Sequence, residues 1–372
     1  MGPQLGYPIP KSMFPDLDPT LVHFAGGGQT PVPDVVAPTI AAFLTRKAGG
    51  QPAYREHWEL VARARRRTAA LMHCAMDDVG FLGSASDGIA RTVNAVEWRA
   101  GDNAVIASDD YASGRAALES LGRRSVTLRR VNAPHGAGRE DALLDACDGR
   151  TRLLYVSQVN PFSGRRMDVA ALHRVLAPRG TIVLNDATHA VGALPVRAAE
   201  ADVTVASTYK FLCASFMGIL AFGTERARAL RPAGAGWYSE TADGASRFEY
   251  GNVPHLDVVI LDAVLEWHAR GDEDARARHL LAVANALEQV LENRGLVAFS
   301  RDGDTGSHNV CVAGKNVKEI ADGLEAQGVR VWYDHGRMRL SAQVFNARED
   351  IDAFDAALGT VLHSTDGKER RP

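Results

Sequence analysis

Short runs of consecutive apolar residues, separated by segments with helical spacing, recur along the N-terminal and central parts of the chain. The apolar runs that are long enough for buried strands are Ala104–Ala107, Val126–Arg129, Leu153–Ser157, Ile182–Leu184, Val203–Ala206 and Ile219–Phe222. Helical spacing covers Asp34–Lys47, Glu56–His73, Asp87–Val96, Gly114–Leu121 and Val169–Leu176. Because continuous apolar strands that alternate with helices build parallel sheets covered on both faces, we predict an α/β fold.

The pattern changes after a Gly- and Ala-rich loop at Arg231–Ser246. Two helices are predicted next, at His255–Arg270 and Asp274–Asn293. The remainder mixes short strands (Val297–Ser300, Asn309–Val312, Val329–Trp332, Met338–Ser341) with helices (Val317–Ala326, Asp350–Leu362). We therefore predict an N-terminal arm (1–20), a large domain (21–265) and a small C-terminal α+β domain (266–372).

Composition excludes several classes of protein. The chain has 372 residues with 46% hydrophobic residues and a net charge of −3, which gives no electrostatic case for nucleic acid or an anionic membrane. The sequence contains no uncharged apolar run long enough to predict a membrane span. The Pro-rich N-terminus lacks the apolar core of a signal peptide. The four scattered cysteines favour free thiols in the cytoplasm, and the 12 histidines form no metal-binding cluster.

Candidate chemistry gathers at the ends of two predicted strands. Asp186 and His189 follow the strand near Ile182, and Ser207-Thr208-Tyr209-Lys210 ends the strand that begins at Val203. Carboxyl ends of parallel strands are where such sheets bind ligands. A buried lysine can form a Schiff base with the aldehyde of pyridoxal 5′-phosphate (PLP), and an aspartate can keep the pyridine nitrogen protonated. The competing interpretation, a turn aspartate and a surface lysine, does not account for the two strands and the hydroxyl run together.

The segments DATHAVGALPV (186–196) and STYK (207–210) resemble the class V aminotransferase family of fold type I PLP-dependent enzymes. This family includes cysteine desulfurases, kynureninase-like enzymes and isopenicillin N epimerase-like proteins. The resemblance extends from about Val22 to about Ala356. It implies a large domain with a mainly parallel, seven-stranded type of sheet, a small C-terminal α+β domain, and a homodimer with shared active sites.

The resemblance also implies roles around the cofactor. Lys210, Asp186 and His189 are expected to be catalytic and to bind the cofactor. Ala85 and Ser86 match phosphate-binding positions at a helix start, although Ser86 is also explained as a helix cap. Further cofactor contacts are expected from Tyr111 over the pyridine ring, from Gln158 near the phenolic oxygen, and from Ser207, Tyr209 and Asn252. A loop aromatic at Tyr111 and a structural histidine at His189 remain alternatives.

Asn252 stands in RFEYGN (247–252), where the family has a threonine that contacts the phosphate of the neighbouring subunit. On the substrate side, Arg339 matches the arginine that binds the α-carboxylate, since a guanidinium pairs with a carboxylate through two parallel hydrogen bonds. Arg337 is the neighbouring candidate on the same strand face. Gly27 and Arg55 match positions near the substrate.

The resemblance narrows the reaction without fixing it. Desulfurases of this family carry a nucleophilic cysteine just before the carboxylate-binding arginine, and the short segment between Trp332 and Arg339 has none. We therefore favour lyase-type chemistry on a small amino acid, either elimination or C–S or C–C cleavage, with Asp334 or His335 as a candidate acid. An aminotransferase is the alternative, followed by an amino-acid epimerase and a non-catalytic PLP-fold binding protein.

Overall fold

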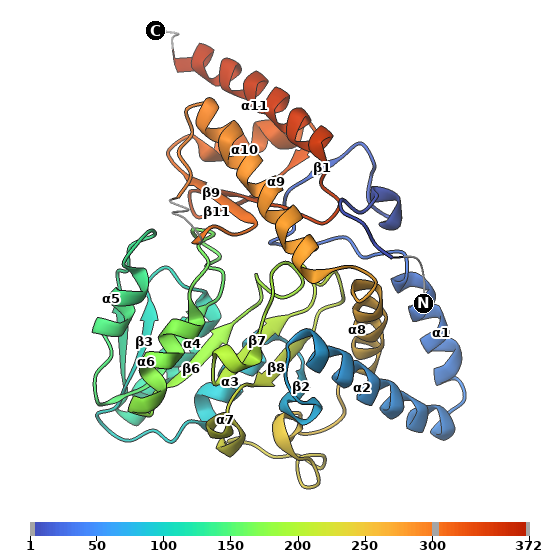
Figure 1. The fold of residues 1–372 in the computed structure, drawn as a ribbon, viewed down its shortest axis with the longest axis vertical. Coiled ribbons are helices and arrows are strands. Elements are labelled where there is room, and N and C mark those ends of the chain that lie inside the picture. Colours follow the sequence, from blue (N-terminus) through green and yellow to red (C-terminus); the bar gives the residue numbers. More distant parts are fainter. Residues whose placement is uncertain (1–3, 300–304, 370–372) are drawn as a thin grey trace. The chain divides into compact units, whose positions relative to one another are not determined.

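A computed structural model describes residues 4–299 and 305–369 of the chain (Figure 1). Its residues form two compact units. Unit 1 contains residues 1–34, 161–166 and 270–372, and unit 2 contains residues 35–160 and 167–269. The predicted domain boundaries after residues 20 and 265 stay a prediction. The two compact units group residues 21–34 and 161–166 with the C-terminal part of the chain.

Unit 2 is built on a seven-stranded sheet with the order β2-β8-β7-β6-β5-β3-β4. The strands are β2 (Val79–Leu82), β3 (Asn103–Ala107), β4 (Thr127–Val131), β5 (Thr151–Ser157), β6 (Ile182–Asp186), β7 (Val203–Ser207) and β8 (Gly218–Phe222). Strand β8 is antiparallel to both of its neighbours, whereas β3 to β7 pair in parallel. The predicted α/β class with a mainly parallel sheet is confirmed.

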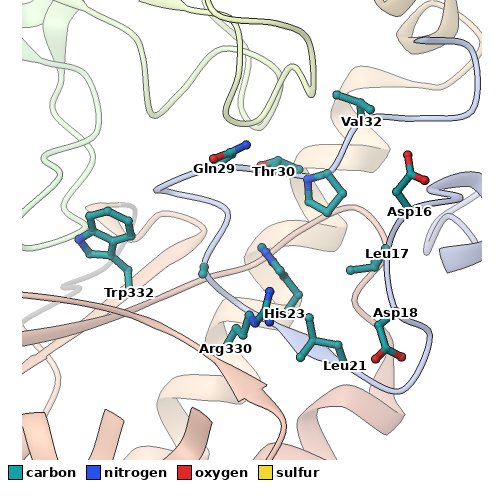
Figure 2. A pocket seen from close by; sticks show the side chains of 12 residues that line it. Asp16, Leu17, Asp18, Leu21, His23, Gln29, Thr30, Val32, Arg330 and Trp332 are labelled. Carbon is teal, nitrogen blue, oxygen red and sulfur yellow. The ribbon is translucent and has the colours of Figure 1, made fainter. Parts of the chain in front are cut away.

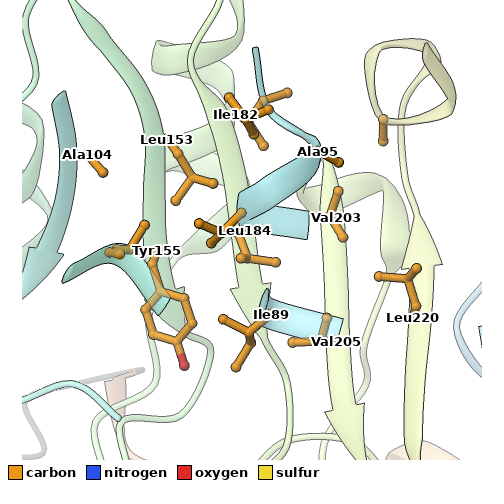
Figure 3. Packing of buried hydrophobic residues seen from close by; sticks show 14 of the residues in the cluster. Ile89, Ala95, Ala104, Leu153, Tyr155, Ile182, Leu184, Val203, Val205 and Leu220 are labelled. Atoms are coloured by element: carbon orange, nitrogen blue, oxygen red, sulfur yellow. The ribbon is translucent and has the colours of Figure 1, made fainter. Parts of the chain in front are cut away.

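Alternate residues of the central strands β3, β5 and β6 enter two hydrophobic clusters on opposite faces of this sheet. Leu153 and Leu184 belong to one cluster with residues of α3 and α4 (Figure 3). Leu154 and Val183 belong to the other cluster with residues of α5 and α6. The strands are therefore buried on both faces, which explains why they have no polar alternation.

The helices of unit 2 are α1 (Val36–Lys47), α2 (Gln51–Leu71), α3 (Ala85–Ala95), α4 (Ala112–Glu119), α5 (Arg139–Asp145), α6 (Val169–Leu176), α7 (Glu225–Ala229) and α8 (His255–His268). Short 3₁₀ turns cover Met76–Asp78, Ser120–Arg124, Ala177–Arg179, Ala198–Glu200 and Gly244–Phe248. Side-chain oxygens cap several starts: Ser84 accepts from the amide of Asp87 at α3, and Asp168 accepts from Ala171 at α6.

Unit 1 contains a three-stranded antiparallel sheet with the order β11-β12-β9. Its elements are β1 (Val22–His23), β9 (Asn309–Ala313), β10 (Val329–Arg330), β11 (Trp332–Asp334), β12 (Arg337–Ser341), α9 (Glu273–Asn293), α10 (Val317–Ala326), α11 (Arg348–Glu369) and a 3₁₀ turn at Lys11–Met13. Strand β1 pairs in parallel with β10. The expected small α+β arrangement is thus present in the C-terminal part of the chain.

The strand predicted at Val329–Trp332 is divided into β10 and β11, which belong to different sheets. Two further local predictions differ from the structure. The helix predicted from Asp87 begins at Ala85, and its cap is Ser84 rather than Ser86. The strand predicted at Val297–Ser300 is reduced to a bridge at Ala298, while Ser300 lies outside the described residues. Ser84 and Ser86 are both suitable helix caps, so the sequence alone does not choose between them. The apolar residues 297–299 likewise fit either a strand or an irregular segment.

Candidate functional site

Lys210 and His189 meet in the interior of unit 2. Lys210 lies three residues beyond the end of β7, and His189 lies three residues beyond the end of β6. Because β6 and β7 are adjacent and parallel, their carboxyl ends bring these segments together. The Nζ atom of Lys210 is 2.9 Å from Nε2 of His189, and both side chains are buried. An amine held against an imidazole in this way is placed for covalent and proton-transfer chemistry.

Asp186 is the last residue of β6 and is buried, with a side chain that is 4% exposed. Its Oδ2 accepts a hydrogen bond of 2.8 Å from the hydroxyl of Tyr155. Its Oδ1 accepts one of 2.9 Å from the backbone N–H of Thr188. A buried carboxylate with this support matches the predicted partner of a protonated ring nitrogen.

Two aromatic rings lie near the amine of Lys210. Nζ is 5.9 Å from the ring centre of Tyr111 and 5.8 Å from that of Tyr209. Tyr111 is the residue before α4, and Tyr209 stacks on Phe216 with ring centres 4.3 Å apart. Burial raises the pKa of Tyr209, so its hydroxyl stays protonated at neutral pH. A flat ligand beside Lys210 would thus have aromatic surfaces available.

The start of α3 offers backbone amides to an anion. Ala85 is its first residue, and the hydroxyl of exposed Ser86 lies 2.7 Å from that of Ser113. The backbone of Gly218 on β8 packs against the same turn, where an added Cβ would lie 2.8 Å from the amide nitrogen of Ala85. Ser207, at the end of β7, donates its backbone N–H to the hydroxyl of Thr188. Helix N-termini with nearby hydroxyls bind phosphate groups.

Asn252 lies on an exposed loop of unit 2, where its Oδ1 accepts a 2.7 Å hydrogen bond from Tyr54. The loop is anchored by Glu249, whose carboxylate pairs with both terminal nitrogens of Arg65 at 2.8 and 3.1 Å. The amide of Phe81 also donates to Glu249 at 2.8 Å. Tyr250 has a left-handed backbone with φ of 60°. This anchoring fixes the loop independently of any bound ligand.

Gln158 follows β5 directly, but its amide is engaged by protein groups. Its Oε1 accepts from Asn185 at 3.1 Å, and its Nε2 donates to the carbonyl of Pro195 at 3.3 Å. Its predicted contact with a cofactor oxygen therefore depends on the remaining N–H. Arg55, the predicted residue at the substrate mouth, is exposed on α2.

Two buried polar residues near the site are absent from the sequence predictions. Tyr155 donates to Asp186, and Asp110 accepts from the hydroxyl and amide of Ser157 and from the amide of Tyr111. Burial raises the pKa of Asp110 to about 6, although these hydrogen bonds oppose the shift. The signals in the sequence are a polar side chain inside an apolar strand for Tyr155 and an acid at the strand end for Asp110.

In unit 1, the predicted carboxylate ligand Arg339 lies on β12 and is buried. Its Nη1 donates to the carbonyl of Pro161 at 2.9 Å, and its guanidinium lies 5.8 Å from the ring centre of Trp332. The backbone of Gly27 packs on it, since an added Cβ would lie 2.8 Å from Nε and Nη2. The neighbouring candidate Arg337 stacks on Phe162 at 4.3 Å. Gly27 and Arg339 thus lie in contact, and their roles at the substrate stay predictions.

The candidate acids Asp334 and His335 occupy the turn of the β11–β12 hairpin. Nδ1 of His335 lies 2.6 Å from Oδ1 of Asp334, and the His335 side chain is 84% exposed. Only His335 and Gly336 connect the two strands, and both have positive φ, of 49° and 72°. This turn leaves no room for a longer loop with a nucleophile.

A hollow of about 640 Å³ lies elsewhere in unit 1 and is lined by residues that include His23, Thr30, Arg330 and Trp332 (Figure 2). His23 is buried, and no hydrogen-bond partner lies within reach of its Nδ1 in the described part of the chain. Burial lowers the pKa of His23 to about 4, so the ring is neutral at physiological pH.

The residues of unit 2 fit PLP. They supply a buried amine, a buried carboxylate at a neighbouring strand end, aromatic surfaces beside the amine, and amides and hydroxyls at a helix start. Within residues 4–299 and 305–369, no three His, Cys, Asp or Glu side chains gather as metal ligands. None of the described helices has the length and apolarity needed to cross a membrane.

Comparison with known proteins shows the family of the chain. The model of the family described as Aminotransferase class-V matches residues 23–354. An uncharacterised protein of Schizosaccharomyces pombe is 23% identical over 82% of this chain and 74% of its own length. A probable cysteine desulfurase of Pasteurella multocida is 24% identical over 60% and 59%, and a kynureninase of Burkholderia mallei is 29% identical over 46% and 43%.

Solved structures show the same fold at low identity. The cystine C–S lyase C-DES, in complex with cysteine persulfide, has a TM-score of 0.86 with 20% identity and covers 93% of this chain and 98% of its own. A cysteine desulfurase of Escherichia coli has a TM-score of 0.84 with 18% identity and covers 95% and 97%. The matches confirm the resemblance, the fold class, and the prediction of a PLP-dependent enzyme.

Proposed function

Because the chain belongs to the class-V aminotransferase family, we propose that this PLP-dependent enzyme cleaves a small amino acid by elimination or by C–S or C–C cleavage. The observation that carries the proposal is the buried contact of 2.9 Å between Lys210 and His189, next to the supported carboxylate of Asp186. When bound, PLP supplies an aldehyde and an electron-accepting ring that stabilises negative charge at the substrate Cα.

The protein residues do the positioning and the proton transfer. Lys210 would hold the cofactor through its amine, and the same amine would take or return the proton at the substrate Cα. His189 orients the amine of Lys210 through the hydrogen bond at Nε2. Asp186, as a carboxylate, would accept a hydrogen bond from the protonated ring nitrogen. Arg339 binds the substrate carboxylate, which the close packing of Gly27 on its guanidinium supports.

Two features favour a lyase over a desulfurase that uses a persulfide. The hairpin before Arg339 turns on His335 and Gly336 and carries no cysteine. The protein with the same fold whose structure contains cysteine persulfide as a product is called a C–S lyase. Asp334 or His335 is proposed as the acid that protonates the leaving group, which their position on the hairpin just before Arg339 supports.

Transamination is the second candidate. Lys210 would also serve this reaction as the base that moves the Cα proton, and the family name itself refers to transamination. We keep epimerisation and a purely binding role as further alternatives, since each uses only part of the same residues.

The reaction can be tested by incubating PLP-loaded protein with a panel of amino acids, including cystine, 3-chloroalanine and kynurenine. A lyase releases ammonia with a keto acid, or a cleaved side-chain fragment, while the cofactor remains in its pyridoxal form. A persistent pyridoxamine form with a keto acid and no ammonia would establish transamination instead. Lys210→Ala is the negative control. A protein that takes up no PLP would point to a different role.

We also propose a homodimer in which Asn252 reaches the phosphate of the neighbouring subunit, because Asn252 lies exposed on a well-anchored loop. The free thiols of Cys74 and Cys147 support a reducing cytoplasmic location. Mixing Lys210→Ala and Asn252→Ala subunits tests the shared site. Mixed dimers should regain activity, because one of their two sites then lacks both substitutions. Failure to regain activity after verified subunit exchange would contradict sharing.

A further inference from the structure

Tyr155 places a hydroxyl group in the interior of unit 2, directly beside the candidate partner of the ring nitrogen. It lies on β5 opposite Leu184 of β6, so Asp186 is its diagonal neighbour on the same face of the sheet. Its ring packs within the apolar cluster, with the hydroxyl at the end toward which the strands point (Figure 3). The Tyr155 side chain is fully buried, and its hydroxyl donates to Oδ2 of Asp186 at 2.8 Å.

The surrounding structure holds this hydroxyl in place. An added Cβ at Gly114 of α4 would lie 2.5 Å from Cζ of Tyr155, so the helix backbone packs directly on the ring. Burial and the negative charge of Asp186 raise the pKa of Tyr155 well above its usual value. The phenol therefore remains protonated and acts as a donor at neutral pH.

The hydroxyl of Tyr155 influences whether a shared proton resides on Asp186 or on the ring nitrogen of PLP. With PLP bound, the carboxyl of Asp186 and the ring nitrogen would share one proton. A hydrogen bond to the charged form of an acid favours that form, and hydrogen bonds from O–H to a carboxylate are among the stronger ones in proteins. Without Tyr155, the buried carboxylate keeps only the amide of Thr188 as a donor among the contacts described above. The proton would then shift from the ring nitrogen to Asp186.

We propose that Tyr155 is a positioning residue that keeps Asp186 ionised, so that the proton remains on the cofactor nitrogen and the ring can accept electrons. This role rests on the proposed function, because it requires PLP bound with its nitrogen at Asp186. Tyr155 would thus act on the cofactor only through the side chain of Asp186.

The test is the ¹⁵N chemical shift of ring-labelled PLP bound to the full-length protein. Wild-type protein should show a shift near that of a protonated pyridine. Tyr155→Phe should move it toward the neutral value, and Asp186→Asn marks the neutral limit. Ring-fluorinated PLP has a less basic nitrogen, so the proton affinities of this nitrogen and of the Asp186 carboxylate become more similar. With it, the ratio of protonated to neutral ring should fall roughly tenfold or more in Tyr155→Phe.

Three comparisons make the result decisive. Tyr238→Phe removes a hydroxyl from another partly buried tyrosine of unit 2 and should leave the shift unchanged. Tyr155→Phe added to Asp186→Asn should have no further effect, since the proton acceptor is already lost. Fluorotyrosine at position 155, a stronger donor, should move the shift toward the protonated value, and it decides the question if Tyr155→Phe does not fold.

Identical shifts for wild type, Tyr155→Phe and the fluorotyrosine protein, with both cofactors, would overturn the role of Tyr155. An equal change in Tyr238→Phe would also overturn it. A protein that binds no PLP gives no bound signal at all, and that outcome refutes the proposed function rather than the role of Tyr155.

Discussion

The Nζ atom of Lys210 lies 2.9 Å from Nε2 of His189, and the two side chains come from the ends of adjacent parallel strands. The contact depends on the order of β6 and β7 in the sheet rather than on their distance in sequence. It places an amine where few water molecules compete for it. The predictions below start from this contact and extend to the residues that surround it.

Lys210→Ala should abolish both cofactor attachment and turnover. Borohydride reduction of the loaded wild-type protein should add the mass of reduced PLP to the peptide that contains Lys210. The variant should show no such peptide and should lose activity by at least about 10²-fold, the lower range for a general base. Lys47→Ala, which changes an exposed lysine of α1, serves as the control. Turnover that survives in Lys210→Ala would remove the basis of the proposed function.

Glu249→Gln should destabilise the protein, because it leaves the buried guanidinium of Arg65 without its ion-pair partner. Breaking a buried pair on one side costs about 3–5 kcal/mol of unfolding free energy. Urea unfolding monitored by fluorescence measures the loss. The double variant Arg65→Met/Glu249→Leu should be less destabilised than the single one, because no unpaired charge remains. Equal losses in both would show that the charges do not matter.

Asp110 should make the protein less stable as the pH rises. Burial raises the pKa of its carboxyl to about 6, above the value of about 4 in an unfolded chain. The folded state therefore binds the proton more tightly, and this contribution is present below pH 4 and is lost as the pH rises through 6. The loss amounts to roughly 3 kcal/mol. Urea unfolding between pH 4 and 7 should show it in wild type relative to Asp110→Asn, and parallel curves would contradict it.

His23 should have the opposite effect in acid. Burial lowers the pKa of its imidazole to about 4, so the unfolded chain binds a proton first as the pH falls. The contribution of His23 is present above pH 6.5 and is lost as the pH falls through 4, by roughly 3 kcal/mol. Acid unfolding of His23→Gln should lack this loss. His335→Gln, at the exposed hairpin turn, should unfold in acid as the wild type does.

Gly27→Ala should weaken substrate binding. The added methyl group would lie 2.8 Å from two nitrogens of Arg339 and 2.6 Å from the hydroxyl of Ser341, so the guanidinium has to move. We expect KM for amino acids to rise roughly tenfold, corresponding to about 1.4 kcal/mol, with thermal stability little changed. Gly6→Ala is the matched control, since open space surrounds its Cβ position. An unchanged KM in Gly27→Ala would argue against Arg339 as the carboxylate ligand.

The central sheet was predictable because its strands are buried on both faces and therefore appear as continuous apolar runs. Strand β2 (Val79–Leu82) escaped prediction, since its four residues include Gly80 and its pairing with β8 is long-range. The direction of β8 was equally hidden, because an apolar run does not reveal whether its neighbours run parallel to it.

The site residues also fall into some whose position the sequence predicts and some whose position it does not. Asp186, His189 and Lys210 could be predicted because polar residues stand at the ends of apolar strands. Tyr155 could not, because its contact with Asp186 depends on the register of β5 against β6. The anchoring of Glu249 by Arg65 joins positions 184 residues apart, and no local pattern encodes it.

The path of the chain through its units has a practical consequence. It passes from one unit to the other after residues 34, 160, 166 and 269. A fragment that starts at Arg270 would lack β1, the partner of β10, and the carbonyl of Pro161 that receives Arg339. No single cut therefore yields either half as an intact autonomous piece. Recombination that exchanges the C-terminal part between relatives should succeed only when the matching N-terminal and middle segments travel with it.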